Sequence, residues 1–191
     1  PMMIEGVSYF SMLREFFKDK PERYPQAAIP TVKTDLKTWI ADSPSIVWFG
    51  HSSYLILIEG KRILVDPVFS DRPSPVQYLG TKSFEGARIY SAEDFPEIDV
   101  LIITHDHYDH LDFKTIKQLK SKVKRVCCSL GLGAHLEHWG YEQSLISELD
   151  WWETFTTEDL SLTAAPGRHF SGRGVKRGQS IWSSFILKTK D

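Results

Sequence analysis

Three of the seven histidines in this sequence fall within six residues, in the segment His105-Asp106-His107-Tyr108-Asp109-His110. Imidazole nitrogens and carboxylate oxygens are ligands that suit borderline cations such as Zn²⁺. A loop that folds back on itself would present His105 and His107 to one cation, and Asp109 and His110 to a neighbouring cation. Imidazoles this close disfavour one another's protonation, and a bound cation is the usual compensation. The segment therefore predicts a two-metal site, and the alternative is a solvated loop that happens to be rich in histidine.

A further ligand must come from another part of the chain, because a tetrahedral cation with one open position takes three protein groups. The best candidate is His169, which lies between an expected strand and a loop, the same kind of position as that of His105. The alternative for His169 is an ordinary loop histidine. With a nearly complete ligand set upstream, we expect ligation.

Four more residues are candidates for supporting or substrate-binding roles. Asp66 ends an expected strand, and it either orients a ligand histidine or caps a turn. His51 either lines the pocket or is satisfied by the backbone at a strand end. Arg168 and Arg173 flank His169 and could receive a phosphate through forked hydrogen bonds, the alternative being an ordinary solvated loop.

The histidine segment directly follows an apolar stretch, residues 98–103, that is typical of a strand buried on both faces. Before it, a β-meander is predicted by three β-rich runs, at residues 46–49, 53–59 and 62–65. After it, helices alternate with strands: a helix at 113–121, a strand at 124–128, a helix at 132–139 and a strand at 144–150. The last third predicts further strands, the final one at 181–187, split by a Gly- and Arg-rich loop at 167–178. A separate helix is expected at residues 8–18.

This order of elements predicts an α/β (α+β) fold, with strands buried by helices on one face. We expect a lead-in segment at residues 1–42 and one domain at residues 43–191. The long, proline-containing connection at 67–97 is expected to form a rim loop. Because the final strand would leave an open sheet edge, we also expect the chain to be truncated after Asp191.

The amino-acid composition limits the classes of partner that we expect for this protein. The net charge is −2, from 23 Lys and Arg against 25 Asp and Glu, which argues against a general electrostatic grip on nucleic acid. The basic run at residues 114–125 is better explained as the solvated face of a helix. No apolar run approaches the ~20 residues of a membrane span, so any membrane contact would be peripheral. Self-association into a homo-oligomer stays open.

The two cysteines are adjacent, at Cys127 and Cys128, and are expected as buried thiols in a reducing compartment. We therefore predict a cytoplasmic location. Since the chain opens with Pro1, a signal or anchor removed upstream stays an alternative. The tryptophans of the motif-bearing segments are expected to be core anchors; they are Trp48, Trp151, Trp152 and Trp182.

The histidine segment resembles the His-x-His-x-Asp-His signature of the metallo-β-lactamase fold superfamily. More narrowly, four other segments look like the branch that contains N-acyl-phosphatidylethanolamine-hydrolysing phospholipase D, with ascorbate-phosphate lactonases among its bacterial relatives. They begin at Trp48-Phe49-Gly50-His51, Ile63-Leu64-Val65-Asp66, Glu148-Leu149-Asp150-Trp151 and Arg168-His169-Phe170-Ser171. The resemblance extends over about residues 30–187.

This resemblance implies a four-layer αβ/βα sandwich, of which the chain holds the N-terminal half and the first strands of the second half. It implies two metal ions, usually zinc, with manganese or iron as alternatives. His105, His107 and His169 would hold the first ion, and Asp109 and His110 the second. The family pattern also has a bridging Asp in a Gly-Asp-Thr/Ser-Gly context and a later His, and neither occurs in this sequence.

We therefore expect a zinc-dependent hydrolase in which a metal-bound hydroxide attacks the substrate while Asp109 accepts or steers a proton. The favoured substrate is a phosphodiester, such as a phospholipid. One alternative is a lactonase that acts on a phosphorylated sugar-acid lactone. An alternative of another class is a non-catalytic metal-binding module, because the ligand set in this sequence is incomplete.

Overall fold

The computed structural model describes residues 8–16, 18, 24–75, 82–173 and 178–190. Its α-helices are α1 (Tyr9–Phe16), α2 (Phe113–Leu119) and α3 (Gly133–His138), and its short 3₁₀ helices are η2 (Ala92–Asp94), η3 (Lys120–Lys122) and η4 (Gln143–Leu145). Its strands are β1 (Ser45–Gly50), β2 (Ser53–Ile58), β3 (Lys61–Val65), β4 (Ile98–Ile103), β5 (Val123–Ser129), β6 (Ile146–Leu149), β7 (Thr154–Thr156), β8 (Leu160–Ala165) and β9 (Ser184–Thr189).

The strands form two sheets. The larger sheet has six strands in the order β1-β2-β3-β4-β5-β6, and the smaller one has the order β7-β8-β9. In the larger sheet β1, β2 and β3 pair antiparallel, as a meander, whereas β3 to β6 pair parallel. Parallel neighbours need crossover connections, and α2 and α3 supply them between β4, β5 and β6.

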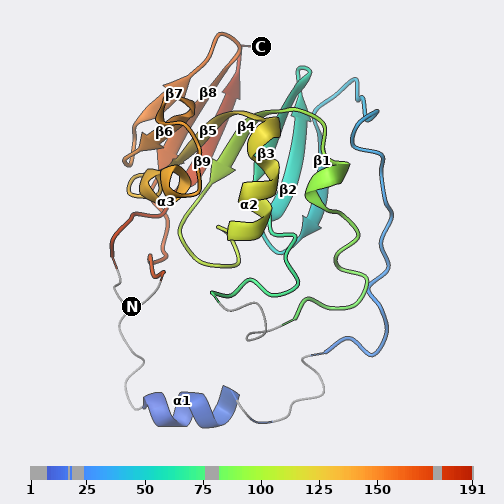
Figure 1. Cartoon of the computed structure of the whole chain (residues 1–191), viewed down its shortest axis with the longest axis vertical. Helices are drawn as coiled ribbons and strands as arrows, with labels where there is room; N and C mark the ends of the chain where they lie inside the picture. Colours follow the sequence, from blue (N-terminus) through green and yellow to red (C-terminus); the bar gives the residue numbers. More distant parts are fainter. Residues whose placement is uncertain (1–7, 17, 19–23, 76–81, 174–177, 191) are drawn as a thin grey trace.

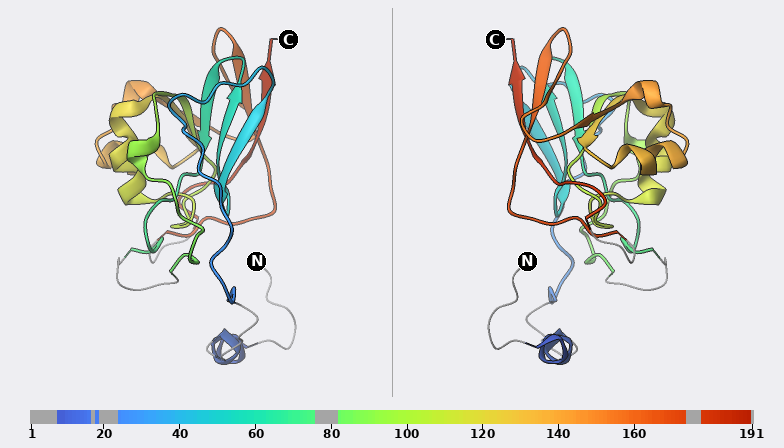
Figure 2. Two further views of the ribbon diagram at one scale, coloured as in Figure 1. Left: turned by 90° about the vertical axis from the view of Figure 1, so that its right-hand side faces the viewer. Right: turned by 90° about the vertical axis from the view of Figure 1, so that its left-hand side faces the viewer.

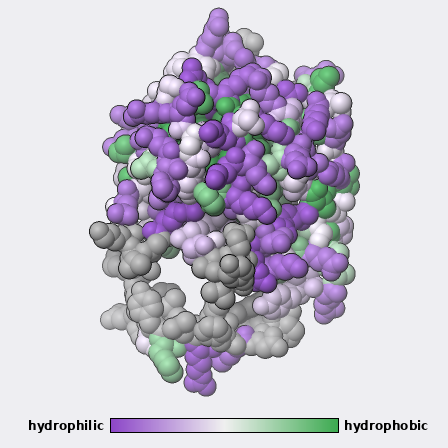
Figure 3. Space-filling view, viewed as in Figure 1, coloured by the Kyte–Doolittle hydropathy of each residue, from purple (hydrophilic) through white to green (hydrophobic). Residues whose placement is uncertain are grey.

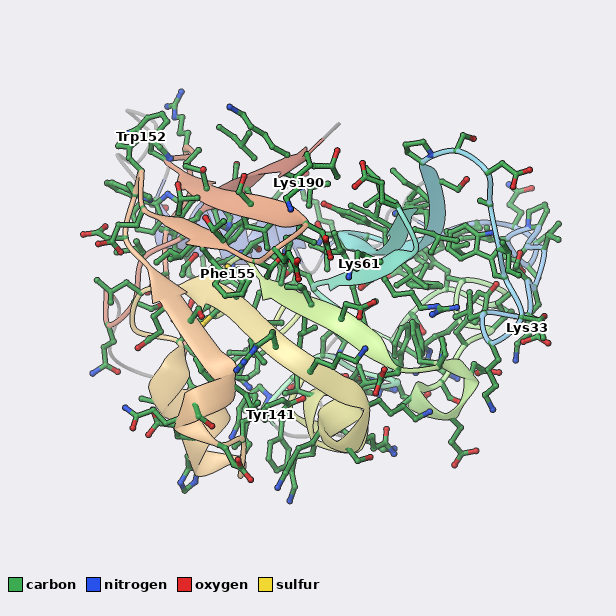
Figure 4. All side chains as sticks on the ribbon, turned by 90° about the horizontal axis from the view of Figure 1, so that it is seen from above. Lys33, Lys61, Tyr141, Trp152, Phe155 and Lys190 are labelled. Carbon is green, nitrogen blue, oxygen red and sulfur yellow. The ribbon has the colours of Figure 1, made fainter. Side chains whose placement is uncertain are left out.

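The elements lie in three layers (Figure 1). Side views show α2 and α3 covering one face of the larger sheet and the smaller sheet covering the other (Figure 2). Seen from above, Phe155 lies on the side where the two sheets meet and Tyr141 on the helix side (Figure 4). The α/β prediction is therefore confirmed, and so is the expectation that the first strands of a second sheet are present.

Because both faces of the larger sheet are covered, its central strands are mainly apolar. In β4, Leu101 and Ile103 pack with α2 in the core on the helix side, while Val100 and Ile102 pack in the core between the sheets. The two adjacent cysteines of β5 divide in the same way, one into each core. The strand predicted at residues 98–103 is thus confirmed with its burial on both faces.

Helix α2 follows the pattern that the basic run predicted. Ile116 and Leu119 are fully buried against the sheet, whereas Lys114 and Lys117 are exposed. The face of the molecule that carries the helices is mainly hydrophilic (Figure 3). This is the solvated helix face expected from the sequence.

The last strand begins later than predicted, at Ser184 rather than at residue 181. The reason lies in backbone hydrogen bonds to the other sheet. The N–H of Ile181 donates to the carbonyl of Leu130 (2.9 Å), and the N–H of Ser183 donates to the carbonyl of Thr104 (3.0 Å). The segment before β9 is thus held at the end of β4, next to the histidine segment, before it enters the smaller sheet.

The prediction that the tryptophans are core anchors is wrong for three of them. Trp48 and Trp152 are 68% and 66% exposed, and Trp151 is 38% exposed. Instead of entering a core, two of the indole N–H groups hold surface turns, Trp48 by donating to the carbonyl of His51 and Trp151 by donating to that of Trp182. Trp182 is partly buried.

The helix expected at residues 8–18 is found as α1, and residue 17 lies outside the described residues. Figure 1 shows α1 apart from both sheets. The division into a lead-in segment and a domain at residue 42 stays a prediction. No helix among the described residues is both long and apolar enough to cross a membrane.

Candidate metal centre

The candidate site lies where β3 and β4 end. These strands are parallel neighbours, with Val65 opposite Ile102, so their carboxyl ends meet at one edge of the sheet. Asp66 follows β3 and the histidine segment follows β4. Loops at the carboxyl ends of parallel strands are where α/β folds place reactive groups.

Asp66 is the centre of a buried hydrogen-bond network. It is 1% exposed, and its Oδ1 accepts from the backbone N–H of Thr104 (2.8 Å). Its Oδ2 accepts from the hydroxyl of Thr104 (2.6 Å) and from Nδ1 of His110 (2.8 Å). Of the two roles considered for Asp66, the geometry places it in the one that orients a histidine.

This network also sets which ring nitrogens are free. Since the hydroxyl of Thr104 donates to Asp66, its oxygen is left to accept from Nδ1 of His105, at 2.9 Å. With Nδ1 donating in both His105 and His110, Nε2 of each ring keeps its lone pair. A lone pair on Nε2, with the other nitrogen bonded to a fixed acceptor, is the usual state of a metal-binding histidine.

The structure brings His105, His107 and His169 together from two distant segments. Nε2 of His169 lies 2.9 Å from Nε2 of His105 and 3.3 Å from Nδ1 of His107. The three nitrogens all lie within 4.8 Å of one another. We refer to these residues as the first group.

The protonation of the first group follows from its environment. Burial and the neighbouring imidazoles of His110, His107 and His169 lower the pKa of His105 to about 2. Burial, followed by the effect of His169, also lowers the pKa of His107. Both rings are therefore neutral near pH 7, the form that binds a cation.

A set of hydrogen bonds joins the two segments that carry the first group. The buried carboxylate of Asp106 accepts from the backbone N–H of Gly172 (2.8 Å) and from the hydroxyl of Ser171 (3.2 Å). In the opposite direction, the guanidinium of Arg173 donates to the carbonyls of Asp106 (3.1 Å) and Leu111 (2.7 Å). We call these four residues, Asp106, Ser171, Gly172 and Arg173, the latch.

The two arginines that the sequence suggested for phosphate binding have different surroundings, because only Arg173 belongs to the latch. Arg173 stacks on the rings of Tyr108 and Trp139 and donates to backbone carbonyls. It therefore packs against the histidine segment. Arg168 is exposed and lines the pocket beside His169. It has no hydrogen bond or ion pair with another residue in the part of the chain that the structure describes.

A second group of donor atoms consists of His51, Asp109 and His110. Nε2 of His51 lies 3.3 Å from Nε2 of His110 and 3.3 Å from Oδ2 of Asp109. The three donor atoms lie within 4.8 Å of one another. We refer to these residues as the second group, and His110 links it to Asp66.

Two members of each group, His105 and His169 of the first and His51 and His110 of the second, line one pocket of about 710 Å³ between the two sheets. One end of the pocket is polar and is lined by His51, Asp66, His105, His110, Arg168 and His169. The other end is apolar and is lined by Ile56 and Val65 from the larger sheet and by Leu162, Phe185 and Leu187 from the smaller one. The pocket thus offers a polar head region and an apolar channel to one ligand.

Sequence reasoning missed the supporting residues, above all Thr104 and Asp106. Asp106 lies between His105 and His107 in a loop, where no strand alternation indicates the direction of its side chain. Nothing in the sequence indicates that Thr104 relays between Asp66 and His105. That relay depends on the register of β3 against β4.

The donor set suits divalent cations. Imidazole nitrogens with one carboxylate are typical ligands of zinc, iron and manganese. The rings of His105 and His107 are neutral, and Nδ1 of His105 is already bonded to Thr104. The nitrogens that face each other in the first group therefore cannot all be satisfied by hydrogen bonds to one another. The residues present therefore fit a cation.

Comparison with known proteins identifies the family and several relatives of this chain. The family model of the beta-lactamase superfamily domain matches residues 61–191. An uncharacterised protein of Mycobacterium tuberculosis is 39% identical over 164 residues, which are 85% of this chain and 44% of that protein. An N-acyl-phosphatidylethanolamine-hydrolyzing phospholipase D of Caenorhabditis elegans is 29% identical over 152 residues, 73% of this chain and 42% of that protein.

Solved structures with the same fold include metal enzymes. CmlA, a diiron β-hydroxylase of Streptomyces venezuelae, superposes with a TM-score of 0.56 at 27% identity, covering 78% of this chain and 28% of that one. The metallo hydrolase Igni18 of Ignicoccus hospitalis superposes with a TM-score of 0.53 at 19% identity, covering 76% and 56%. The chain spans less than half the length of the curated relatives named above.

Proposed function

The chain belongs to the beta-lactamase superfamily, and from that premise we propose that it is a metal-dependent hydrolase of phosphodiesters of the phospholipid type. The observation that carries this proposal is the convergence of three imidazole nitrogens, from His105, His107 and His169, beside a pocket whose polar end is lined by His105 and His169 and whose other end is apolar. The similarity to a phospholipase D that hydrolyses N-acyl-phosphatidylethanolamine supports the substrate class.

In this proposal the first group holds one cation, and Asp109 and His110 hold a second. Zinc suits these donors best, and the similarity to a diiron enzyme makes iron the first alternative, ahead of manganese. A divalent cation in such a site supplies Lewis acidity and makes water a competent nucleophile near neutral pH. Binding the phosphate and moving the proton are the proposed roles of the side chains described next.

Asp109 is the proposed proton acceptor. Its side chain is 49% exposed, so its carboxylate is accessible to a water molecule. Water adds to phosphorus, the bond from phosphorus to one ester oxygen breaks, and the proton of the water passes to Asp109. The products are a phosphomonoester and an alcohol, and the alcohol takes up the proton. The neutral ring of His105 and the oriented ring of His110 keep their positions throughout, because both are fixed through Asp66.

Arg168 is the proposed phosphate-binding residue. It lines the pocket next to His169, and a guanidinium can donate two parallel hydrogen bonds to the oxygens of a phosphodiester. An acyl chain of the same phospholipid would lie along Leu162, Phe185 and Leu187 at the apolar end. A ligand with one charged and one apolar part therefore matches both ends of the pocket.

The test is a comparison of substrates on the chain loaded with zinc, iron or manganese. We expect metal-dependent turnover of bis(p-nitrophenyl) phosphate and of N-acyl-phosphatidylethanolamine, and none of a phosphorylated sugar-acid lactone. Turnover of the lactone alone would replace this proposal by the lactonase. Binding of metal without turnover of any of them would leave the non-catalytic module. The variant His169→Ala should be inactive, while His138→Ala, on the exposed side of α3, should keep full activity.

A cytoplasmic location and the boundary at residue 42 are also proposals. Cys127 and Cys128 are both free and buried, which supports a reducing compartment. Fractionation of the native protein tests the location, and limited proteolysis that stops near residue 42 would support the boundary.

A further inference from the structure

The residue that we single out is His51, in the turn between β1 and β2. The turn has a left-handed backbone, with φ of 105° at Gly50 and 48° at His51. A positive φ is uncommon for a residue with a side chain, and such conformations gather at functional sites. The pairing of β1 with β2 shifts register between Trp48 and Gly50, and the indole N–H of Trp48 donates to the carbonyl of His51 at 2.9 Å. The protein thus holds His51 in a conformation that a free turn would avoid.

This conformation brings the imidazole of His51 to the second group. The rings of His51 and His110 meet edge to face, with centroids 5.0 Å apart. Nε2 of His51 lies 3.3 Å from Nε2 of His110 and 3.3 Å from Oδ2 of Asp109. Four bonds of about 2.0–2.1 Å around a tetrahedral cation put neighbouring ligand atoms about 3.3–3.4 Å apart. The two distances at His51 equal that separation.

A simple hydrogen bond explains only half of this arrangement. His51 could donate from Nε2 to the carboxylate of Asp109, but a ring nitrogen carries a single hydrogen. The second close atom, Nε2 of His110, keeps its lone pair, because Nδ1 of that ring donates to Asp66. A lone pair and a carboxylate oxygen that converge with a third donor atom form a cation site.

We propose that His51 is a ligand of the second cation, together with Asp109 and His110. This inference rests on the proposed function, since it completes the second metal position of the same site. Two nitrogens and one oxygen suit zinc, iron or manganese. The side chains of His51 and Asp109 are 60% and 49% exposed, and His51 lines the pocket. The second cation is therefore the one that lies open to solvent and substrate.

The experiment is a titration of the metal-free full chain with Zn²⁺, followed by calorimetry, and with Co²⁺, followed by absorption. For the unaltered chain we expect two bound equivalents. In His51→Ala the first equivalent should bind unchanged. The second should weaken by at least about 100-fold, since losing a contact outside the ligand shell already costs about 10- to 100-fold. His51→Gln, which retains a polar side chain of similar size, should behave like His51→Ala.

The matched control is His138→Ala, which removes an exposed histidine from α3 and should leave both equivalents unchanged. An unchanged second equivalent in both His51 variants, or fewer than two equivalents in the unaltered chain, would overturn the inference. The two proposals fail separately. Loss of the second equivalent in His51→Ala without phosphodiester turnover by the unaltered chain would refute the proposed function alone. Turnover with the second equivalent retained in the His51 variants would refute the role of His51 alone.

Discussion

The two groups of donor atoms differ in how firmly the fold holds them. In the first group His105 is 5% exposed and hydrogen-bonded through Thr104, and the latch ties the segment of His107 to the segment of His169. In the second group the ring of His110 is hydrogen-bonded to the buried Asp66, while the side chains of His51 and Asp109 are 60% and 49% exposed. A preorganised group binds with less loss of conformational entropy. We therefore expect the first group to keep its cation under conditions that strip the second.

The largest expected effect comes from breaking the first group itself. His169→Ala removes one of the three donors of the first group. It should weaken the affinity for the first cation by more than about 100-fold, which exceeds the loss expected from removing a contact outside the ligand shell. Metal content after dialysis against a chelator measures this. The matching control is His135→Ala, on α3 and outside both groups. A tight equivalent that survives in His169→Ala would remove this residue from the ligand set.

Asp66→Asn should affect both groups, because Asp66 orients His110 directly and His105 through Thr104. The amide offers one oxygen where the carboxylate accepts three hydrogen bonds, so at least one donor is left unpaired. We expect both equivalents to weaken by about 10- to 100-fold in a zinc competition titration. An effect on the second equivalent alone would show that the relay through Thr104 does not operate.

Asp106→Ala should separate the groups, because the carboxylate of Asp106 joins the segment of His107 to the segment of His169, and both histidines belong to the first group. Removing this carboxylate leaves the N–H of Gly172 and the hydroxyl of Ser171 without their acceptor. We expect the first equivalent to weaken by about tenfold. We also expect the free energy of unfolding to fall by about 1–3 kcal/mol, measured by urea denaturation of the metal-free chain.

Asp106→Asn is the matched variant, since it keeps an acceptor for Gly172 and should lose less of both quantities. A second equivalent that weakens as much as the first in Asp106→Ala would mean that the latch does not distinguish the groups.

The smallest expected effect is specific to the second group. Trp48→Phe removes the hydrogen bond that holds the turn of His51, which contributes about 1 kcal/mol and corresponds to about a fivefold change in affinity. Only the second equivalent should weaken in the calorimetric titration. Ile46→Ala, an exposed position on the same strand, is the control. Equal affinities in both variants would mean that the turn does not need this hydrogen bond.

Local patterns allowed most of the fold to be predicted. Alternation and apolar runs marked the strands of the larger sheet, and the apolar residues Ile116 and Leu119 marked the buried face of α2. The start of β9 could not be predicted in this way. The preceding residues are as β-prone as the strand itself, and hydrogen bonds to Leu130 and Thr104 decide where pairing begins.

In the candidate site, too, local sequence patterns predicted some features and tertiary structure decided the others. The spacing of His105 and His107, and the position of His169 after an expected strand, suggested that the three would meet, and the structure brings them together. The position of His51 depends on a left-handed turn that residue types do not reveal. The roles of Arg168 and Arg173 could not be told apart either, since only tertiary packing places one in the pocket and the other on Tyr108 and Trp139.

The most direct test is anomalous diffraction from crystals of the zinc-loaded chain, with data collected on both sides of the zinc absorption edge. We predict a strong peak bonded at about 2.0–2.1 Å to the ring nitrogens of His105, His107 and His169. A weaker peak should lie against His51, Asp109 and His110. Zinc found in the crystal with no peak among His105, His107 and His169 would contradict the metal centre.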